Sequence, residues 1–485
     1  MTPHTVRRRL TALLITGLLA LAAHAQTDTG SGTTGSGTGS GTDTGSGTGS
    51  GVVGSGTTSY DAPNTYDLGG GTVTLATAIL NGGTVTNGAI NASTGFTGYS
   101  GTVTAQLLGS GGLTKTTSDT LVLAGTNNFS GGTTVSEGTL QIGDGTASAT
   151  FTGAITNNAT VVFNRGGDYA YGNYITGTGD VVQNGDILRL QIPQTYTGRT
   201  LVNSGYLVLA ANADQGLSTS TQVYVASGAY FDISNHATTG AGLTGAGTVY
   251  SFGGSSGHLG VAPPDGERQV FSGTLGGSYP NFAFTKSGTG TLVLSGANTY
   301  TGNTDVSAGT LLVNGSLGST ATTVASGATL GGTGSISGAT TIATGGILAP
   351  GDSVGTLTFH DGLSLASGAV LSFDLGTTGD LIVVDGGTLA GPASGSVTVN
   401  LANAGGLTAA TYTLFNFTGA TLSDFDAADF SLGTSPSGWS YTFGLTADSL
   451  QVTVSAVPEP STIALALGAA GLGCVLLRRR RALQR

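Results

Sequence analysis

Two segments of the chain match the G-x-S-x-G pattern that surrounds the nucleophilic serine of many hydrolases. They are residues 253–257 and 351–355. In such enzymes the serine lies on a sharp turn between a strand and a helix, and a histidine and a carboxylate complete the triad. Neither segment has that context, and a chain with 87 glycines in 485 residues produces such matches by chance. We therefore predict no nucleophile at either serine.

The acidic residues form two clusters that could do acid–base chemistry. β-Helical polysaccharide lyases and glycosidases need grouped carboxylates on one face. Asp424, Asp426 and Asp429 have no Lys or Arg nearby, and the Asp-Gly-Glu-Arg segment 265–268 follows two prolines. Solvated turns account for both, with a calcium site at the first cluster as the alternative. We predict no catalytic residue and no enzymatic activity, and keep a carbohydrate-active β-helical enzyme as the alternative function.

The histidines give no metal-ligand pattern. His236, His258 and His360 are far apart and show no spacing typical of zinc or other metal sites. The single cysteine, Cys474, allows no intramolecular disulfide. We predict neither a metal nor a cofactor.

Three tyrosines could contact a ligand. Tyr169, Tyr171 and Tyr174 lie in a glycine-bounded segment that we expect to be a loop. Aromatic faces beside polar groups suit carbohydrate binding. These tyrosines are therefore candidate ligand contacts, and a loop that packs on the flank of the fold is the alternative.

The N-terminus has the three parts of a secretory signal. Arg7, Arg8 and Arg9 precede an apolar run of about a dozen residues, and Ala23 and Ala25 occupy the −3 and −1 positions of a cleavage site. We predict a signal peptide over residues 1–25 with cleavage after Ala25. The run is short for a membrane span, so a retained helix is the weaker interpretation.

The C-terminus carries a second candidate targeting signal. Pro458, Glu459 and Pro460 precede an apolar stretch, residues 461–477, whose helix would rise roughly 25 Å, which is at the short limit for a membrane span. Four arginines then follow and would stay on the cytoplasmic side: Arg478, Arg479, Arg480 and Arg481. This arrangement resembles the PEP-CTERM sorting tail of Gram-negative bacteria, with a plain C-terminal anchor as the alternative. The resemblance implies an exosortase-like processing enzyme as partner, transient insertion in the inner membrane, and a final location outside the cell, often with exopolysaccharide.

Between these ends the composition is nearly free of charge. Residues 26–59 are almost wholly Gly, Ser and Thr and predict a flexible linker. Apart from the two terminal arginine groups and Glu459, the chain holds six basic and 24 acidic residues. So acidic a surface repels phosphate backbones, and we exclude nucleic acid as a partner.

The body repeats one frame three times. Leu121-x-Leu123 is followed at fixed distances by Phe129-x-Gly131 and Gly138-x-Leu140. The same frame, with the same internal spacing, returns from Leu188 and again from Leu292. Short β-branched segments bounded by glycine turns predict strands, and each is too short to bury a core alone. The frame therefore predicts stacked turns of one repeating fold.

The copy at residues 288–302 resembles the autotransporter-associated β-strand repeat, and residues 327–357 are similar to autotransporter passengers. The resemblance implies an all-β, right-handed parallel β-helix, which we place at residues 60–395. Glycine permits the corners, and neutral Thr, Ser and Asn ladders avoid like charges one turn apart. At about 20–25 residues a turn, we expect some 15–18 turns.

Beyond residue 395 the strands become longer and more aromatic. We predict that residues 396–456 form a small antiparallel β cap on the open end of the solenoid. Residues 457–485 complete the chain as the sorting tail. Autotransporter passengers are followed by a membrane β-barrel, and only about 60 residues precede the tail here. We expect the sorting tail to replace the barrel.

These expectations predict a non-enzymatic protein at the surface or in the extracellular matrix of a Gram-negative bacterium, acting in adhesion or association with extracellular polysaccharide. A second alternative is an ice-binding solenoid. The pairs Thr84–Thr86 and Thr356–Thr358 could form a flat hydroxyl array, because alternate strand residues share a face.

Overall fold

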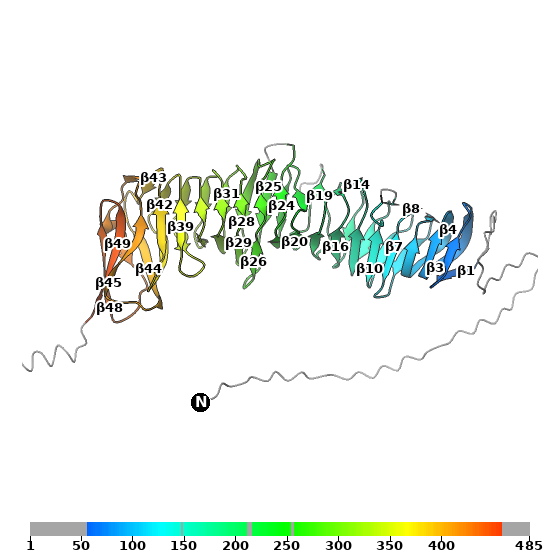
Figure 1. The fold of residues 1–485 in the computed structure, drawn as a ribbon, viewed down its shortest axis with the longest axis horizontal. Coiled ribbons are helices and arrows are strands. Elements are labelled where there is room, and N and C mark those ends of the chain that lie inside the picture. Colours follow the sequence, from blue (N-terminus) through cyan, green and yellow to red (C-terminus); the bar gives the residue numbers. More distant parts are fainter. Residues whose placement is uncertain (1–55, 147–148, 211–215, 254–256, 458–485) are drawn as a thin grey trace, which may run out of the picture. The chain divides into compact units, whose positions relative to one another are not determined.

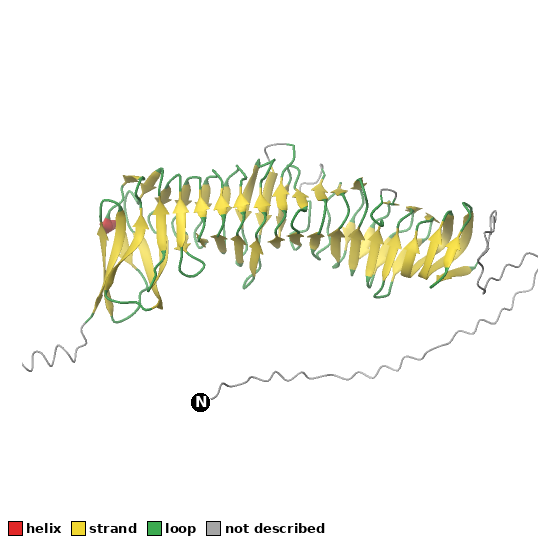
Figure 2. Cartoon of the chain, viewed as in Figure 1, coloured by secondary structure: helices red, strands yellow, loops and turns green. Residues whose placement is uncertain are grey.

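The computed structural model describes residues 56–146, 149–210, 216–253 and 257–457. Short parallel strands stack into a solenoid of about 15 turns. Figure 1 shows the turns following one another in sequence order, and Figure 2 shows that strands dominate. Among the described residues the single helix is the one-turn 3-10 helix η1 (Ala427–Asp429). The predicted parallel β-helix is confirmed.

Each turn contributes a strand to three ladders, which we call the first, second and third ladder in the order in which the chain visits them. The first ladder runs furthest without a break. Its strands are β7 (Thr120–Leu123), β10 (Thr139–Ile142), β13 (Thr160–Phe163), β16 (Asp180–Gln183), β18 (Thr200–Val202), β20 (Gln222–Val225), β23 (Gly242–Gly245), β26 (Arg268–Phe271), β29 (Thr291–Leu294), β32 (Thr310–Val313), β35 (Thr329–Gly332), β38 (Ile347–Pro350), β41 (Val370–Gly376), β44 (Val397–Gly405) and β47 (Phe430–Leu432).

The second ladder consists of two sheets. The first of them contains β14 (Asp168–Tyr171), β17 (Ile187–Leu190), β19 (Tyr206–Leu209), β21 (Tyr230–Asp232), β24 (Thr248–Tyr250) and β27 (Thr274–Leu275). The other contains β30 (Ala297–Asn298), β33 (Ser316–Leu317), β36 (Ser335–Ile336), β39 (Thr356–Phe359), β42 (Leu381–Val384) and β45 (Ala410–Asn416). The two sheets meet where the side-chain oxygen of Asn298 accepts the N–H of Leu275 at 3.1 Å.

The third ladder completes each turn. In the C-terminal half it contains β22 (Ala237–Gly240), β25 (Gly257–Val261), β28 (Phe282–Lys286), β31 (Thr304–Val306), β34 (Thr322–Val324), β37 (Thr340–Ile342), β40 (Leu363–Leu365), β43 (Thr388–Ala390) and β46 (Thr421–Ser423).

The N-terminal turns contain two long strands, β3 and β4. The first strand begins at Thr57, inside the segment that we assigned to the linker. β3 and β4 each run through most of a turn and pair with one another over their length. The strands of this part are β1 (Thr57–Asp61), β2 (Thr65–Asp67), β3 (Thr72–Thr86), β4 (Ala89–Val103), β5 (Gln106–Gly109), β6 (Gly112–Lys115), β8 (Thr126–Phe129), β9 (Thr133–Val135), β11 (Thr150–Phe151), β12 (Ile155–Asn157) and β15 (Ile175–Thr176).

The three copies of the sequence frame each span one turn of the solenoid. Leu121 is the ladder partner of Leu140, Leu188 of Leu207, and Leu292 of Leu311. All six leucines are buried. The middle copy begins on the second ladder, whereas the outer two begin on the first. The frame therefore encodes a turn and not a fixed side of the solenoid.

The glycine before each second leucine fits this geometry. Gly138 and Gly309 have φ of 66° and 61°. A Cβ atom at Gly138 would lie 2.3 Å from the carbonyl oxygen of Thr117, and one at Gly309 would lie 2.5 Å from that of Gly288. Only glycine accepts both the positive φ and the close approach of the preceding turn.

Two lysines are fully buried at the corner that follows the third ladder. Lys115 and Lys286 occupy equivalent positions relative to two copies of the frame. The Lys286 ammonium donates to the carbonyl oxygens of Ser287, Gly288 and Ala308 at 2.8, 2.9 and 2.9 Å. The Lys115 ammonium donates to the carbonyl oxygens of Thr117 and Glu137. Each ammonium therefore binds carbonyl groups from two successive turns.

A buried amide precedes the aromatic residue of each copy by two positions. Asn298 donates to the carbonyl oxygens of Gly296 and Ser316, both at 3.0 Å, and Asn127 donates to those of Gly125 and Thr150 at 2.8 and 3.3 Å. In the middle copy Gln194 takes this role, bonding Asn173 and Ile192. These amides tie neighbouring turns together inside the core.

The aromatic residue itself meets a buried threonine four positions later. The Tyr300 and Thr304 hydroxyl oxygens lie 2.6 Å apart, as do those of Tyr196 and Thr200. Phe129 has no hydroxyl, and the equivalent Thr133 hydroxyl has no hydrogen-bond partner among the described residues. The first copy thus leaves the Thr133 hydroxyl unsatisfied, and the Asn127 side-chain oxygen also has no partner among the described residues.

The C-terminal end is only partly antiparallel. β49 (Ser449–Ala456) pairs antiparallel with both β45 and β48 (Trp439–Leu445). The expectation of an antiparallel strand at residues 396–401 is wrong, because β44 continues the parallel first ladder with Leu371 opposite Val399 and Phe373 opposite Leu401. These apolar side chains extend the solenoid core before the antiparallel strands cover it.

Candidate binding surface and sorting tail

The predicted signal peptide and the predicted sorting motif with its membrane segment lie outside the described residues. Ala25 belongs to the first, and Pro458, Glu459, Pro460 and the arginines at 478–481 belong to the second. Their roles remain predictions. The last described residue, Val457, directly follows the central strand of the cap. None of the helices in the described ranges has the length and apolar character needed to cross a membrane.

The structure separates the three tyrosines that we predicted as ligand contacts. The expected loop is wrong for residues 168–171, which form β14, because alternate side chains of this segment point into the core. Tyr169 and Tyr171 are buried, and their hydroxyls donate to the carbonyl oxygens of Phe151 and Gly153. Burial raises the pKa of Tyr169 to about 12. Tyr174, at 53% exposure, is the one ring of the three that a ligand can reach.

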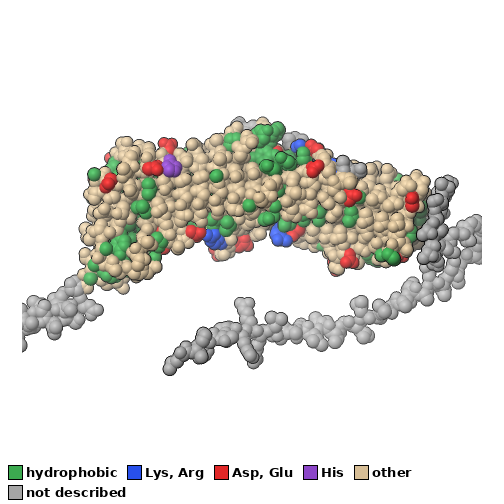
Figure 3. Space-filling view, viewed as in Figure 1, with side chains coloured by type: hydrophobic (Ala, Val, Ile, Leu, Met, Phe, Trp, Pro, Cys, Tyr) green, Lys and Arg blue, Asp and Glu red, His purple; other side chains and the backbone are tan. Residues whose placement is uncertain are grey.

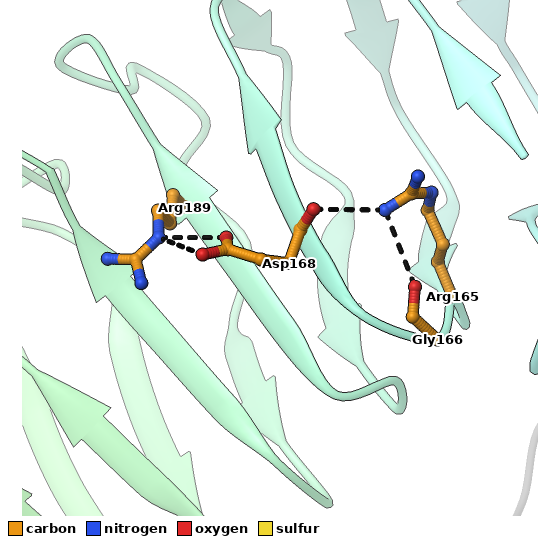
Figure 4. Close-up of polar contacts among 4 residues, drawn as sticks. All are labelled: Arg165, Gly166, Asp168 and Arg189. Atoms are coloured by element: carbon orange, nitrogen blue, oxygen red, sulfur yellow. Dashed lines mark hydrogen bonds and ion pairs between the residues drawn. The ribbon is translucent and has the colours of Figure 1, made fainter. Parts of the chain in front are cut away.

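An ion pair lies on the outer side of β14. Arg189 Nε donates to both carboxylate oxygens of Asp168 at 2.8 and 2.9 Å, across neighbouring strands. Arg165 donates to the main-chain oxygens of Gly166 and Asp168 and lies 4.9 Å from the ring centre of Tyr169. Figure 4 shows Asp168 between the two arginines. The hydrogen bond to Asp168 raises the pKa of Arg189.

Neither G-x-S-x-G segment assembles a triad in the described part of the chain. Residues 254–256 lie outside it. In the other segment Asp352 pairs with Arg268 and accepts a hydrogen bond from Asn314 at 3.2 Å. His258 Nε2 lies 2.8 Å from the Thr285 hydroxyl on the third ladder, away from Ser353.

The carboxylate clusters serve local structure. Asp426 caps η1, and its N–H donates to Asp429 at 2.7 Å. Glu267 accepts hydrogen bonds from Gln222 and Gln269. In the described ranges no three His, Cys, Asp or Glu side chains converge as metal ligands.

The threonine pairs do not continue into an array two residues wide. Thr84 lies between Thr65 and Thr102, but Thr86 faces Asp67. Thr358 faces Ser335 on one side and Val383 on the other, and Thr356 faces Leu381. A regular hydroxyl lattice is therefore absent around both pairs in the described structure.

Five aromatic side chains form a continuous row along the outer side of the second ladder, and we call them the aromatic row. They come from four successive turns: Tyr206, Tyr230, Tyr250 with Phe252, and Tyr279. Figure 3 shows hydrophobic side chains gathered over the middle of the solenoid, along the edge where Figure 1 places β24 and β25.

The rings change their orientation along the row. Tyr206 and Tyr230 stack with centroids 4.6 Å apart and planes inclined by 10°. Tyr250 turns by 81° relative to Tyr230, and Tyr279 lies 5.7 Å from Tyr250 at 32°. Phe252 meets Tyr279 edge to face at 4.8 Å and 73°. The first two rings cover one another, whereas the later rings cannot stack in series.

Polar groups support the row from beneath. The buried Asp232 accepts the N–H groups of Ser234 and Phe252 at 2.8 and 3.0 Å, which fixes the chain that carries the Phe252 ring. Burial, together with the charge of Asp232, raises the pKa of Tyr250 above its usual range. Its hydroxyl therefore stays protonated and can donate a hydrogen bond at physiological pH.

Sequence reasoning missed this row because its members lie far apart in the chain, with a whole turn of the solenoid between one and the next. The signal was present as an aromatic residue recurring once per turn from Tyr206 to Tyr279. It becomes visible only when turn lengths are known. The turn lengths are unequal along the second ladder. The turn from Tyr230 to its partner Thr248 is shorter than the turn from Thr248 to its partner Thr274.

Comparison with known proteins defines the class. Residues 113–142 and 284–313 match the family described as passenger-associated-transport-repeat, and residues 456–481 match the PEP-CTERM protein-sorting motif. The two passenger repeats contain the outer two copies of our frame, including both buried lysines. The chain is thus an exported cell-surface protein with a β-helical passenger-type body and an exosortase sorting motif.

A similar individual protein is the adhesin BmaC autotransporter of Brucella suis biovar 1 (strain 1330). It is 30% identical over 296 residues. The alignment covers 49% of this chain and 8% of that protein, so this chain corresponds to a small part of the adhesin's length.

Proposed function

We propose that the protein is a non-enzymatic surface or matrix protein that is processed by an exosortase-like enzyme and associates with extracellular polysaccharide. The observation that carries the proposal is the combination of a passenger-type solenoid with a PEP-CTERM motif in one chain. The solenoid supplies a long repetitive side for adhesion, and the motif supplies the route to the surface. The adhesin similarity supports the adhesive role.

The sorting step follows from the chemistry of the tail. Pro458 and Pro460 lack an N–H group and restrict the residues before them, which keeps the motif out of helix and sheet. The apolar stretch 461–477 lies at the lower limit of membrane thickness, so it holds the chain in the inner membrane weakly. The arginines at 478–481 orient the body outward. An extended motif above the membrane is accessible to a membrane-embedded processing enzyme.

Mass spectrometry of the surface-located native protein tests this step. We expect a mature chain that begins at residue 26, ends near the Pro-Glu-Pro motif and lacks residues 463–485. The variant Glu459→Ala should accumulate in the inner-membrane fraction with an intact tail. An intact C-terminal Arg485 on the surface form would show that the tail is a plain anchor.

A binding and turnover screen tests the non-enzymatic role. The purified exported protein is incubated with neutral and acidic polysaccharides, and both retention and chain length are measured. We expect retention on at least one polysaccharide with no shortening of its chains. Depolymerisation would instead identify a β-helical lyase or glycosidase.

A further inference from the structure

We propose that the aromatic row binds an extended neutral polysaccharide, whose chain lies along the solenoid axis on the outer side of the second ladder. The inference rests on the proposed association with polysaccharide and adds the site and the class of glycan. It concerns Tyr206, Tyr230, Tyr250, Phe252 and Tyr279, with Arg189 at one end.

The first argument is exposure. Some outward positions of the second ladder hold small polar residues, for example Ser316, Ser335 and Thr358, which are partners on neighbouring strands. In the row, Phe252 is 54% exposed and Tyr279 is 44% exposed. Large rings facing water cost solvation free energy and contribute little to a β-solenoid core. Their concentration on one side indicates a binding surface.

The second argument is ring geometry. The steep angles between Tyr250 and its neighbour Tyr230, and between Phe252 and Tyr279, prevent these rings from stacking on one another in series. Ring area at Phe252 and Tyr279 therefore stays open to the C–H face of a sugar. Tyr206 and Tyr230, stacked together, present ring edges and hydroxyl groups for hydrogen bonds with sugar hydroxyls.

The third argument is direction and length. The row advances along successive turns from Tyr206 to Tyr279, and stacked strands are about 4.8 Å apart, so it extends roughly 15 Å along the axis. Successive sugars of an extended pyranose chain are separated by a distance similar to the spacing between stacked strands. The row therefore matches a few consecutive sugars of a linear glycan and not a single compact ligand.

The fourth argument is charge. The ion pair of Arg189 with Asp168 is neutral overall, and the buried Asp232 adds a negative charge beneath the rings. The body as a whole carries far more acidic than basic residues. An acidic glycan would be repelled by this charge. The Arg189 guanidinium uses its Nε for both hydrogen bonds to Asp168, so its terminal N–H groups can donate to the hydroxyl groups of a sugar. This favours a neutral glycan.

The fifth argument separates a glycan from a second copy of the chain. A stable protein dimer buries about 800 Å² on each partner. Five partly exposed rings spread over four turns offer much less apolar area than that. A short stretch of polysaccharide needs only a few rings and hydrogen-bonding groups.

The test uses the purified exported protein and an array of linear oligosaccharides of five to eight sugars. Neutral β-glucans, xylans and galactans are compared with an acidic alginate series. We expect binding to a neutral series, weak or no binding to alginate, and at least a tenfold loss of affinity in the double variant Phe252→Ala/Tyr279→Ala. Tyr206→Phe should lose about threefold, because it removes one hydroxyl and keeps the ring.

A matched control keeps the test specific. Tyr224 is 38% exposed on β20 of the first ladder, outside the row. Tyr224→Ala should bind as the unchanged protein does. Circular dichroism and the melting temperature check that every variant remains folded.

The outcomes distinguish the site from the function. If the unchanged protein binds a glycan and the double variant binds it equally well, the row is not the site, although the association with polysaccharide stands. If no glycan binds, the association itself fails and the inference with it. Preference for alginate overturns the neutral class. If the double variant abolishes only self-association, measured by sedimentation, a second copy is the occupant and the inference is wrong.

Discussion

The two passenger repeats, residues 113–142 and 284–313, have the same leucine frame but differ in how their buried polar groups are hydrogen-bonded. Both contain a buried lysine, an amide and a threonine at equivalent positions. In the later repeat the Tyr300 hydroxyl hydrogen-bonds with the Thr304 hydroxyl. The side-chain nitrogen of Asn298 donates hydrogen bonds, and its side-chain oxygen accepts one. In the earlier repeat Phe129 leaves Thr133 without a partner, and the Asn127 oxygen also lacks one among the described residues. The leucines thus define the turn, while the polar groups determine how firmly successive turns are joined.

The largest expected effect is at the buried lysines. Lys286→Met removes three hydrogen bonds from a charged donor at the joint between two turns, so we expect a loss of about 2–3 kcal/mol in local unfolding free energy. Lys115→Met should cost a similar amount. Native-state hydrogen exchange of amides in the affected turns measures the loss, because solenoids open locally.

A control for the lysine variants places methionine where it faces solvent. Thr323→Met on β34 changes an exposed side chain and should alter stability by less than about 0.5 kcal/mol. Exchange rates that are the same in Lys286→Met and in the unchanged protein would contradict a clamping role for the ammonium.

The amides should show the next largest difference. Asn298→Ala removes three hydrogen bonds and should cost about 2 kcal/mol, whereas Asn127→Ala removes two and also deletes an unpaired oxygen, and should cost about 1 kcal/mol. Urea unfolding followed by tyrosine fluorescence compares the two variants. Equal or reversed losses would show that the unpaired oxygen of Asn127 carries no penalty.

The aromatic exchange tests the comparison in both directions. Phe129→Tyr supplies the hydroxyl that Thr133 lacks and should stabilise the first repeat by about 1 kcal/mol, since a buried polar group gains a partner. Tyr300→Phe should destabilise the later repeat by a similar amount. Both are measured by urea unfolding. Destabilisation by Phe129→Tyr would mean that the first repeat has no room for the hydroxyl, despite its matching frame.

The smallest effect is a pH dependence. Burial lowers the pKa of Lys286 to about 8, and its value in the unfolded chain is about 10.5. Between these values the unfolded chain retains a proton that the folded chain releases, so stability rises with pH. The carbonyl groups that the ammonium binds lie at a partly exposed corner, where water screens its charge. We therefore expect a gain of at most about 1 kcal/mol as the pH rises through the folded-state value.

Variants of both lysines assign that pH dependence. Unfolding free energies are compared at pH 7.5 and 9.5, and Lys286→Met should abolish most of the gain. Burial also lowers the pKa of Lys115, but Asp119 and Glu137 act in the opposite direction there. Lys115→Met should therefore leave most of the gain in place, and an equal loss in both variants would contradict the difference between the two sites.

Much of the fold could be predicted because each copy of the frame repeats the same buried leucines and corner glycines, which few other residue types can replace. The leucine frame marked one turn of the solenoid, and Gly138 and Gly309 marked corners that other residues cannot adopt. The position of each turn's start could not be predicted, because turn length varies and the copy at Leu188 begins on a different ladder. The ends of the parallel region were also misjudged, since β44 is long and apolar like an antiparallel strand.

The candidate site was harder to predict than the fold. The glycine-bounded segment with Tyr169 and Tyr171 suggests an exposed loop, but it forms a strand, in which residues at alternate positions share one face, and here that face is the core. The members of the aromatic row are adjacent only in space. Sequence spacing identifies contacts within a turn, whereas a surface built across turns requires the register between strands.

The position of β49 determines how the molecule would bear tension. This strand is hydrogen-bonded on both sides, to β45 and β48, and the chain leaves it directly for the sorting tail. A pull on the tail along the strand would have to shear two antiparallel ladders at once, whereas an edge strand would peel away bond by bond. Tension applied through the tail would therefore load a strand that is mechanically strong and is joined to the solenoid through β45.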